Sequence, residues 1–240
     1  MSTAPQITAF LRTGNRVFLS LLVLFFTATQ SPAQVRSIRM ACVGNSITIG
    51  YGLPNPNAAY PQEVGRLLGP KYEVKNFGVS GRTMLKRGDY PYWKEKFFDD
   101  ALAFKPQILT ICLGTNDSKP WNWKYKRDFF RDYMDMIDTF REVNPLVKVF
   151  VCYPPPVFHS KYGITDSIVH RQVIPIIRRV WKASHSYLID FYHPMTNDGK
   201  YFFDGVHLDS IGDSIMAQIV YSTLKRDLRN SSSEIKYQGR

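Results

Sequence analysis

The sequence has few cysteines and no long hydrophobic run. Only Cys42, Cys112 and Cys152 are cysteines among 240 residues, and an odd number cannot pair completely, so we expect no disulfide framework. Each falls near the end of a predicted core strand, where we expect a small buried hydrophobic group. Hydrophobic residues make up 44% and charged residues 21% of the chain. This ordinary globular usage excludes disordered, collagen-like and multi-pass membrane proteins.

The excess of basic residues is not organised into a nucleic-acid-binding motif. The chain has 31 Lys and Arg against 20 Asp and Glu, a formal net charge of +11. Such a charge by itself points to an acidic partner. The basic residues are dispersed through predicted helices and loops, however, and no recognised nucleic-acid-binding motif is present. We therefore expect no nucleic-acid partner.

The N-terminus has the pattern of a secretory signal peptide. Two arginines precede an apolar run over 17–26, which is shorter than the about 20 residues that a bilayer span needs. Ser31 and Ala33 occupy the −3 and −1 positions of a cleavage site after Ala33. We predict a signal peptide over 1–33, a secreted or periplasmic protein, and no stable membrane insertion after cleavage. An uncleaved membrane anchor is the alternative.

The rest of the chain alternates strand and helix patterns. Short apolar runs predict strands at 38–43, 72–77, 108–113, 147–153 and 187–190. Helical spacing of apolar residues predicts helices at 58–68, 93–104, 125–143, 167–184 and 211–228, with a kink or a start at Pro175. This alternation favours one α/β domain over 34–229, a three-layer α/β/α sandwich with a five-stranded parallel sheet. A flexible polar tail is predicted over 230–240.

Polar residues gather directly after the predicted strands, where parallel sheets place their chemistry. The four segments concerned are Gly44-Asn45-Ser46-Ile47-Thr48, Asn76-Phe77-Gly78-Val79-Ser80-Gly81, Gly114-Thr115-Asn116-Asp117 and Asp204-Gly205-Val206-His207-Leu208. In this order they resemble the four signature blocks of the SGNH hydrolases, also called GDSL-type esterases and acylhydrolases. The resemblance implies the flavodoxin-like fold of that family and a serine esterase activity. We expect no cofactor and no metal, since the remaining histidines show no metal-ligand spacing.

Acyl transfer needs a nucleophile, a base, a group that orients the base, and donors for the oxyanion. Ser46 is the candidate nucleophile, and His207 is the candidate base because imidazole accepts and returns protons near neutral pH. Asp204 lies three residues before His207, so a tight turn can aim both side chains at one point. The resemblance implies the same three roles for these residues.

The resemblance also implies an oxyanion hole formed by the backbone N–H of Ser46, the backbone N–H of Gly78 and the side-chain amide of Asn116. Asn45 stands where the family most often has Asp, a position outside the catalytic triad. From the residues alone two alternatives stay open. Ser46 has the position of a helix N-cap, and Ser80 competes as nucleophile because it also follows a strand and lies between glycines.

Two loops next to these blocks are rich in aromatic and basic residues. Aromatic faces beside a catalytic serine commonly stack on sugar rings, and basic side chains suit acidic sugars. The alternative is that these rings pack beneath their loops. The candidate substrate-binding residues are Asn45, Arg82, Tyr90, Trp93, Trp121 and Trp123.

The motifs resemble in particular those of bacterial carbohydrate O-acetylesterases. They predict an exported esterase that hydrolyses O-acyl esters, above all O-acetyl esters, of a carbohydrate or of another small acyl-ester substrate. The alternatives are a lysophospholipase or thioesterase with a longer acyl pocket, an acyltransferase on the same scaffold, and a non-catalytic binding module. The sequence has no long apolar segment of the kind that forms a lipid-binding lid, which counts against a lipase.

Overall fold

The computed structural model describes residues 37–237, with side chains described as far as residue 228. The predicted signal peptide over 1–33 lies outside these residues. Within the described part of the chain, no helix is both long enough and apolar enough to cross a membrane.

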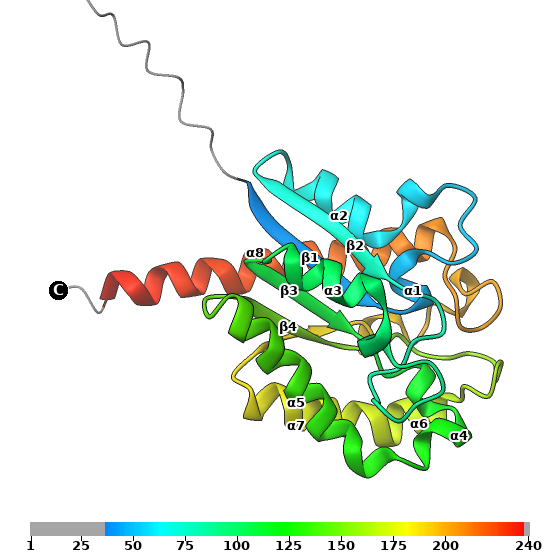
Figure 1. The fold of residues 1–240 in the computed structure, drawn as a ribbon. Helices are drawn as coiled ribbons and strands as arrows, with labels where there is room; N and C mark the ends of the chain where they lie inside the picture. Colours follow the sequence, from blue (N-terminus) through cyan, green and yellow to red (C-terminus); the bar gives the residue numbers. More distant parts are fainter. Residues whose placement is uncertain (1–36, 238–240) are drawn as a thin grey trace, which may run out of the picture. The chain divides into compact units, whose positions relative to one another are not determined.

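A five-stranded parallel sheet forms the centre of the domain, in the order β2-β1-β3-β4-β5 (Figure 1). The strands are β1 Ile38–Gly44, β2 Tyr72–Gly78, β3 Ile108–Cys112, β4 Lys148–Tyr153 and β5 Tyr187–Asp190. All neighbouring pairs are parallel, so the predicted α/β fold is confirmed. The strand order reverses between β1 and β3, and ligands bind beyond the carboxyl ends of the strands at such a point.

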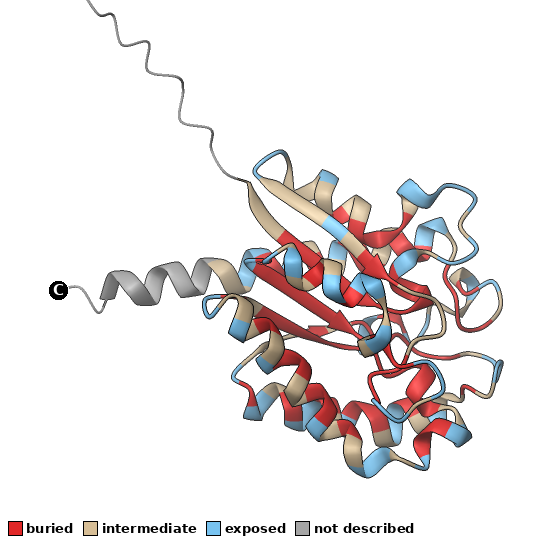
Figure 2. Cartoon of the chain, viewed as in Figure 1, coloured by how far each residue is buried: buried red, intermediate tan, exposed pale blue. Residues whose placement is uncertain are grey.

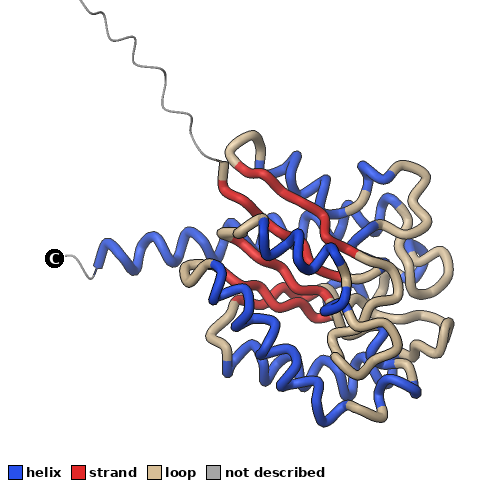
Figure 3. Tube along the Cα trace, viewed as in Figure 1, coloured by secondary structure: helices blue, strands red, loops and turns tan. Residues whose placement is uncertain are grey.

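Helices cover both faces of the sheet and complete the three layers (Figure 3). One face packs against α3 Lys96–Ala103, α5 Lys126–Val143 and α7 Ile174–Ala183, and the other against α2 Tyr60–Leu68 and α8 Ser210–Tyr237. The shorter helices are α1 Ser46–Ile49, α4 Pro120–Trp123, α6 Asp166–Ile168, η1 Pro56–Ala58, η2 Tyr92–Lys94, η3 Asn116–Ser118, η4 Val169–Val173, η5 His193–Met195 and η6 Gly199–Tyr201.

The strands divide their side chains between two hydrophobic cores, so the central strands are buried along most of their length (Figure 2). In β1, Ala41 packs on the side of α5, whereas Met40 and Cys42 pack on the side of α8. All three cysteines are buried on the α8 side and none forms a disulfide, as the sequence predicts. Burial raises the pKa of the Cys42 thiol to about 12, which keeps this thiol protonated and unreactive.

Two helices differ from their predicted form. The helix predicted over 167–184 contains a π-helical turn, Val169–Val173, directly before α7. Pro175 has no N–H for the preceding turn and its ring crowds the carbonyl four residues earlier, so the backbone widens there. The closing helix α8 continues to Tyr237. Residues 230–237, for which the sequence predicts a flexible tail, are therefore helical, because that segment contains no glycine or proline to end the helix.

A buried carboxylate joins the two helices on one face of the sheet. Asp213 of α8 accepts a hydrogen bond of 2.7 Å from the backbone N–H of Tyr60, the first residue of α2. The unpaired N–H groups at a helix N-terminus favour such a negative group. Burial raises the pKa of Asp213 to about 7, although the Tyr60 N–H lowers it.

We predict that Asp213→Asn becomes more stable relative to the wild type as the pH rises. Asn keeps an oxygen for the Tyr60 N–H but does not titrate. The folded pKa lies above the ordinary Asp value, so the folded wild type binds a proton that the unfolded chain releases. The stability from this proton is present below about pH 4 and is lost as the pH rises through about 7.

Urea unfolding at about pH 5 and about pH 8 measures this effect. The free energy of unfolding of the wild type, taken relative to that of Asp213→Asn, is expected to fall between the two pH values. An identical difference at both would contradict the role given to Asp213.

Candidate active site

Ser46 is the first residue of a short helix that begins directly after β1. The side-chain oxygen of Asn45 accepts a hydrogen bond of 3.0 Å from the N–H of Ile47, so Asn45 caps α1. Gly44 ends β1 where a Cβ would lie 2.0 Å from Oγ1 of Thr48. The alternative in which Ser46 caps the helix is therefore wrong, and the Ser46 hydroxyl is left to meet other groups.

Ser46, His207 and Asp204 form a chain of hydrogen bonds. Nε2 of His207 lies 2.9 Å from Oγ of Ser46, and Nδ1 lies 2.9 Å from Oδ2 of Asp204. Because an ionised carboxylate only accepts, the proton of this pair sits on Nδ1, and Nε2 accepts the hydroxyl proton of Ser46. Ser80, the competing candidate, hydrogen-bonds no histidine among the described residues; its carbonyl oxygen accepts a bond from Arg82.

Asp204 is held in place by donors from its own turn and from a neighbouring loop. Its Oδ1 accepts the N–H groups of Val206 at 3.0 Å and of His207 at 2.8 Å. Its Oδ2 also receives the hydroxyl of Tyr162 at 3.3 Å and Nζ of Lys161 at 3.4 Å. Burial by itself raises the pKa of Asp204, but the hydrogen bonds from His207 and Val206 outweigh it and hold this pKa well below its ordinary value. The carboxylate therefore stays ionised beside His207.

Gly78 does not provide the oxyanion donor that the resemblance implies. Its N–H donates to Oδ1 of Asn76 at 2.9 Å, and Nδ2 of Asn76 donates to the carbonyl of Thr48 at 2.8 Å. A Cβ on Gly78 would lie 2.4 Å from the backbone N of Ile49. Gly78 is thus a packing residue that lets α1 approach β2, and its N–H is already engaged.

Asn116 and Gly81 offer polar donors that the fold leaves available. Nδ2 of Asn116, just beyond β3, donates to the carbonyl of Arg82 at 3.2 Å, which uses one of its two amide hydrogens. Gly81 has a φ of +82°, with nothing within 4 Å of the position of a Cβ. Within residues 37–237, the backbone N–H groups of Gly81 and Ser46 donate to no acceptor.

Asp117 anchors the loop that follows Gly81. This fully buried carboxylate accepts the N–H groups of Met84 at 3.0 Å and of Leu85 at 2.7 Å. Burial raises the pKa of Asp117 to about 7, although these two bonds lower it. Because Asp117 directly follows Asn116, it ties the amide of Asn116 to the loop that carries Gly81.

Comparisons with known proteins identify the family of the chain. The GDSL-like lipase/acylhydrolase family matches residues 42–215. The chain belongs to this family. An acetylxylan esterase of Xylanibacter ruminicola is 40% identical over an alignment of 208 residues, and the match covers 79% of this chain and 43% of that protein. The chain therefore spans less than half the length of that relative.

Solved structures of other esterases share the fold of this family member. An acetyl xylan esterase has a TM-score of 0.62 at 23% identity, with 78% of this chain and 100% of that chain covered. A carbohydrate acetylesterase from Sinorhizobium meliloti has a TM-score of 0.63 at 16% identity, with 78% and 98% covered. An aryl esterase of M. smegmatis has a TM-score of 0.60 at 18% identity, with 79% and 99% covered.

Half of the predicted substrate-binding residues of this GDSL-like chain serve its interior instead. Asn45 is fully buried and caps α1. Trp123 is buried, and its Nε1 donates a hydrogen bond to the side-chain oxygen of Gln172. Nε1 of Trp93 donates to the carbonyl of Met84. The packing alternative therefore holds for Trp123, and Trp93 is half-buried with its ring packed against the core.

The other three predicted substrate-binding residues reach the surface. Tyr90 and Trp121 are exposed. The guanidinium of Arg82 lies 5.4 Å from the centre of the Tyr90 ring and pairs with Glu95 at 2.7 Å. Nε1 of Trp121 donates to Asp89 at 2.8 Å, and Nζ of Lys119 lies 5.8 Å from the centre of its ring. Both aromatic rings therefore contact neighbouring groups while about half of each side chain stays exposed.

Three exposed aromatic rings surround His207, and sequence reasoning missed all of them. The ring centres of Tyr51, Tyr162 and Phe203 lie 4.6, 5.9 and 6.0 Å from that of His207. Their exposed fractions are 49%, 47% and 53%. Two of them were within reach of the sequence, since Phe203 directly precedes Asp204 and Tyr51 follows α1. Tyr162 comes from a distant loop that only the fold brings to the site.

Among the described residues, no three or more His, Cys, Asp or Glu side chains are grouped to hold a metal ion. His193 instead pairs with Asp190 through Nδ1 at 2.7 Å, and the ring of His170 stacks on Tyr192 with centres 4.7 Å apart.

We predict that Gly78→Ala destabilises the protein by about 1–3 kcal/mol and lowers its activity, since a methyl group there pushes α1 and Ser46 out of position. Gly65→Ala is the matched control. A Cβ at Gly65 meets the side chain of Val74 at an ordinary 3.5 Å, and replacing a glycine inside α2 favours the helix by up to about 1 kcal/mol. Denaturant unfolding and hydrolysis of a nitrophenyl ester measure both variants. Equal stability of the two variants would refute the close-approach role of Gly78.

Proposed function

We propose that this chain is a serine esterase of the GDSL-like family, in which Ser46 attacks the ester carbonyl. The chain of two 2.9 Å contacts from Ser46 through His207 to Asp204 carries this proposal. Nε2 of His207 takes the hydroxyl proton as the bond to the acyl carbon forms, and then gives it to the departing alcohol. Water attacks the acyl-enzyme by the same route, with His207 as base. Asp204 keeps the imidazole in the tautomer that the reaction needs.

The oxyanion of the tetrahedral intermediate needs donors that are in place before the reaction. The backbone N–H of Ser46 and the second amide hydrogen of Asn116 are proposed for this role. Gly81 replaces Gly78 as the third donor in the proposal, because the N–H of Gly81 is unengaged within the described residues and the space beside it is open. Loss of one such donor typically lowers the rate by about 100- to 1000-fold.

Acetylated carbohydrate is the proposed substrate class. The 40% identical relative is named an acetylxylan esterase, and three exposed aromatic rings stand around His207. Flat apolar rings with polar edges match the faces of sugar rings, while the hydroxyls of the sugar remain in water. The signal-peptide pattern over 1–33 supports export, which would bring the enzyme to an extracellular or periplasmic glycan.

We expect Ser46→Ala to lower kcat by about 10⁴-fold or more, because no other hydroxyl is activated by His207. Ser80→Ala is the matched control and is expected to keep wild-type activity. Release of nitrophenol from a short-chain nitrophenyl ester, and of acetate from acetylated xylan, measures both variants. An active Ser46→Ala together with an inactive Ser80→Ala would reverse the assignment of the nucleophile.

Tyr51→Ala is expected to raise KM for an acetylated xylo-oligosaccharide about fivefold, which corresponds to about 1 kcal/mol of lost ring contact. KM for nitrophenyl acetate, which has no sugar ring, should change much less. Phe97→Ala removes an exposed ring of α3 that, among the described residues, has no ring contact with His207, and serves as control. A preference for long acyl chains over acetate in the wild type would contradict the acetylesterase proposal and favour a lysophospholipase or thioesterase.

A further inference from the structure

The end of β5 carries a second Asp-X-X-His turn, in Asp190-Phe191-Tyr192-His193. Oδ1 of Asp190 accepts the N–H groups of Tyr192 at 2.9 Å and His193 at 3.0 Å, and its Oδ2 meets Nδ1 of His193 at 2.7 Å. The same three bonds, in the same order, hold His207 on Asp204. The fold thus orients a second imidazole at the carboxyl edge of the sheet.

This second imidazole is not aimed at a nucleophile. Asp190 accepts the Nδ1 proton, so Nε2 of the neutral His193 ring is an acceptor. Within residues 37–237, Nε2 of His193 has no hydrogen-bond partner, and the side chain is exposed. An oriented acceptor that meets no hydroxyl of its own chain is suited to receive a hydroxyl from a ligand.

His193 lines a cavity of about 790 Å³ between α7 and the ends of β4 and β5. The cavity is cationic. Arg178 and Lys182 of α7 also line it, one helical turn apart, and neither forms an ion pair with any described residue. Asp190 is the only acidic residue in its lining, and its carboxylate already accepts three hydrogen bonds. A ligand with a negative group would therefore meet unpaired cations.

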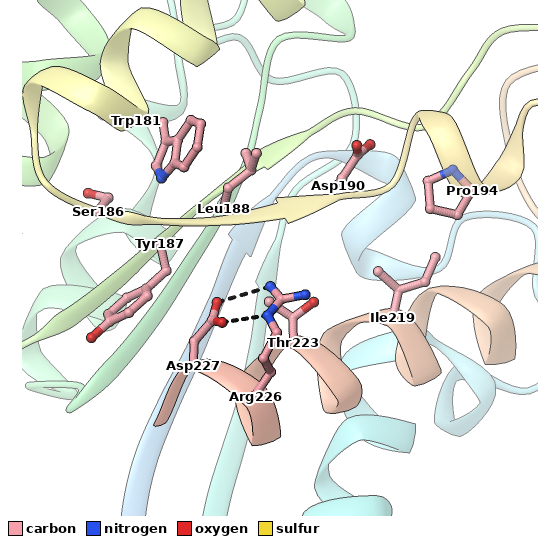
Figure 4. A pocket seen from close by; sticks show the side chains of 10 residues that line it. All are labelled: Trp181, Ser186, Tyr187, Leu188, Asp190, Pro194, Ile219, Thr223, Arg226 and Asp227. Carbon is pink, nitrogen blue, oxygen red and sulfur yellow. Dashed lines mark hydrogen bonds and ion pairs between the residues drawn. The ribbon is translucent and has the colours of Figure 1, made fainter. Parts of the chain in front are cut away.

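Figure 4 shows the edge strand β5 from close by, and its two sides differ. Leu188 and Asp190 lie on the same side of the strand as Trp181 of α7. On the α8 side the positive charge belongs to Arg226, and it is neutralised because Arg226 pairs with Asp227 at 2.6 Å. Among the described residues that line the two sides of β5, the unpaired cations Arg178 and Lys182 lie on the α7 side.

The walls of the cavity indicate a ligand larger than a simple anion. Tyr153, Trp181 and Leu188 give it aromatic and apolar surfaces. Its volume falls in the range of about 300–1,000 Å³ typical of sites for small organic molecules. The guanidinium of an arginine matches a carboxylate with two parallel hydrogen bonds. A sugar ring that carries a carboxylate combines the ring face, the hydroxyls and the charge that this lining would recognise.

We propose that the cavity between α7 and β5 binds a hexuronate unit, with its carboxylate on Arg178 and Lys182 and a ring hydroxyl donating to Nε2 of His193. In the sheet order β5 stands three places from β1, about 14 Å at ordinary strand spacing. The cavity is therefore separate from the Ser46 site. The proposal concerns binding and does not depend on the hydrolytic activity proposed above.

Isothermal titration of the full chain with sodium glucuronate tests the proposal. Saturable binding to the wild type is expected, and Arg178→Gln/Lys182→Gln should weaken it at least about tenfold, because two charge-assisted contacts are lost. Lys71→Gln/Lys94→Gln removes the same charge from other surfaces and should leave binding unchanged. Nitrophenyl acetate hydrolysis by Arg178→Gln/Lys182→Gln should match the wild type, which shows that the variant is folded and separates this test from that of the esterase proposal.

Two further measurements identify the ligand chemistry. Glucose should bind far more weakly than glucuronate if the cations hold the carboxylate. His193→Ala should weaken the binding of glucuronate several-fold and leave the binding of acetate unchanged, because acetate has no hydroxyl. The proposal is overturned if glucuronate does not bind the wild type, if the Lys71→Gln/Lys94→Gln control weakens binding equally, or if inorganic phosphate or acetate binds as tightly as glucuronate.

Discussion

The site depends on the close approach of one short helix to two strands that end in glycine. Gly44 of β1 and Gly78 of β2 are register partners, and a Cβ on either would collide with α1. Because these two residues have no side chains, α1 can begin two residues after the end of β1, and Ser46 is its first residue. The reversal of strand order between β1 and β3 places the Asn116 segment on the other side of β1. Backbone space at two positions thus decides where the nucleophile stands.

Carboxylates that accept backbone N–H groups organise the irregular segments around the sheet. Asp117 holds the loop after β2, Asp204 and Asp190 each close an Asp-X-X-His turn, and Asp213 meets the first N–H of α2. Each gives an acceptor to N–H groups that no strand or helix satisfies. In the two turns the second oxygen also fixes a histidine ring. The same turn therefore orients His207 beside Ser46 and His193 beside the cationic cavity. The two histidines differ in the groups that other parts of the chain place around them.

The aromatic residues divide into two populations with different physical roles. Trp93 and Trp123 lie beneath their loops and hydrogen-bond through their indole N–H groups, so they stabilise the frame. Tyr51, Tyr162 and Phe203 keep much of their surface in water next to His207. Exposed apolar surface costs free energy unless a ligand covers it. Such an arrangement beside a Ser-His-Asp chain is the physical basis for proposing a sugar ester as the substrate.

The sequence by itself predicted the sheet and its five strands and placed Ser46, Asp204 and His207 among the candidate site residues. The resemblance to the SGNH hydrolases favoured Ser46 over Ser80, and the contact between Ser46 and His207 appears only in the folded chain. Continuous apolar runs predict buried strands, and polar residues directly after those runs indicate the carboxyl edge of the sheet. It did not separate Gly78, the last residue of β2, from Gly81, three residues further on, because the difference lies in which backbone N–H group is already engaged. Tyr162 and the β5 cavity were equally out of reach, since they depend on loops and helices distant in the chain. Tertiary structure decided these points because burial, free donors and unpaired charges are properties of the packed chain, which no local pattern contains.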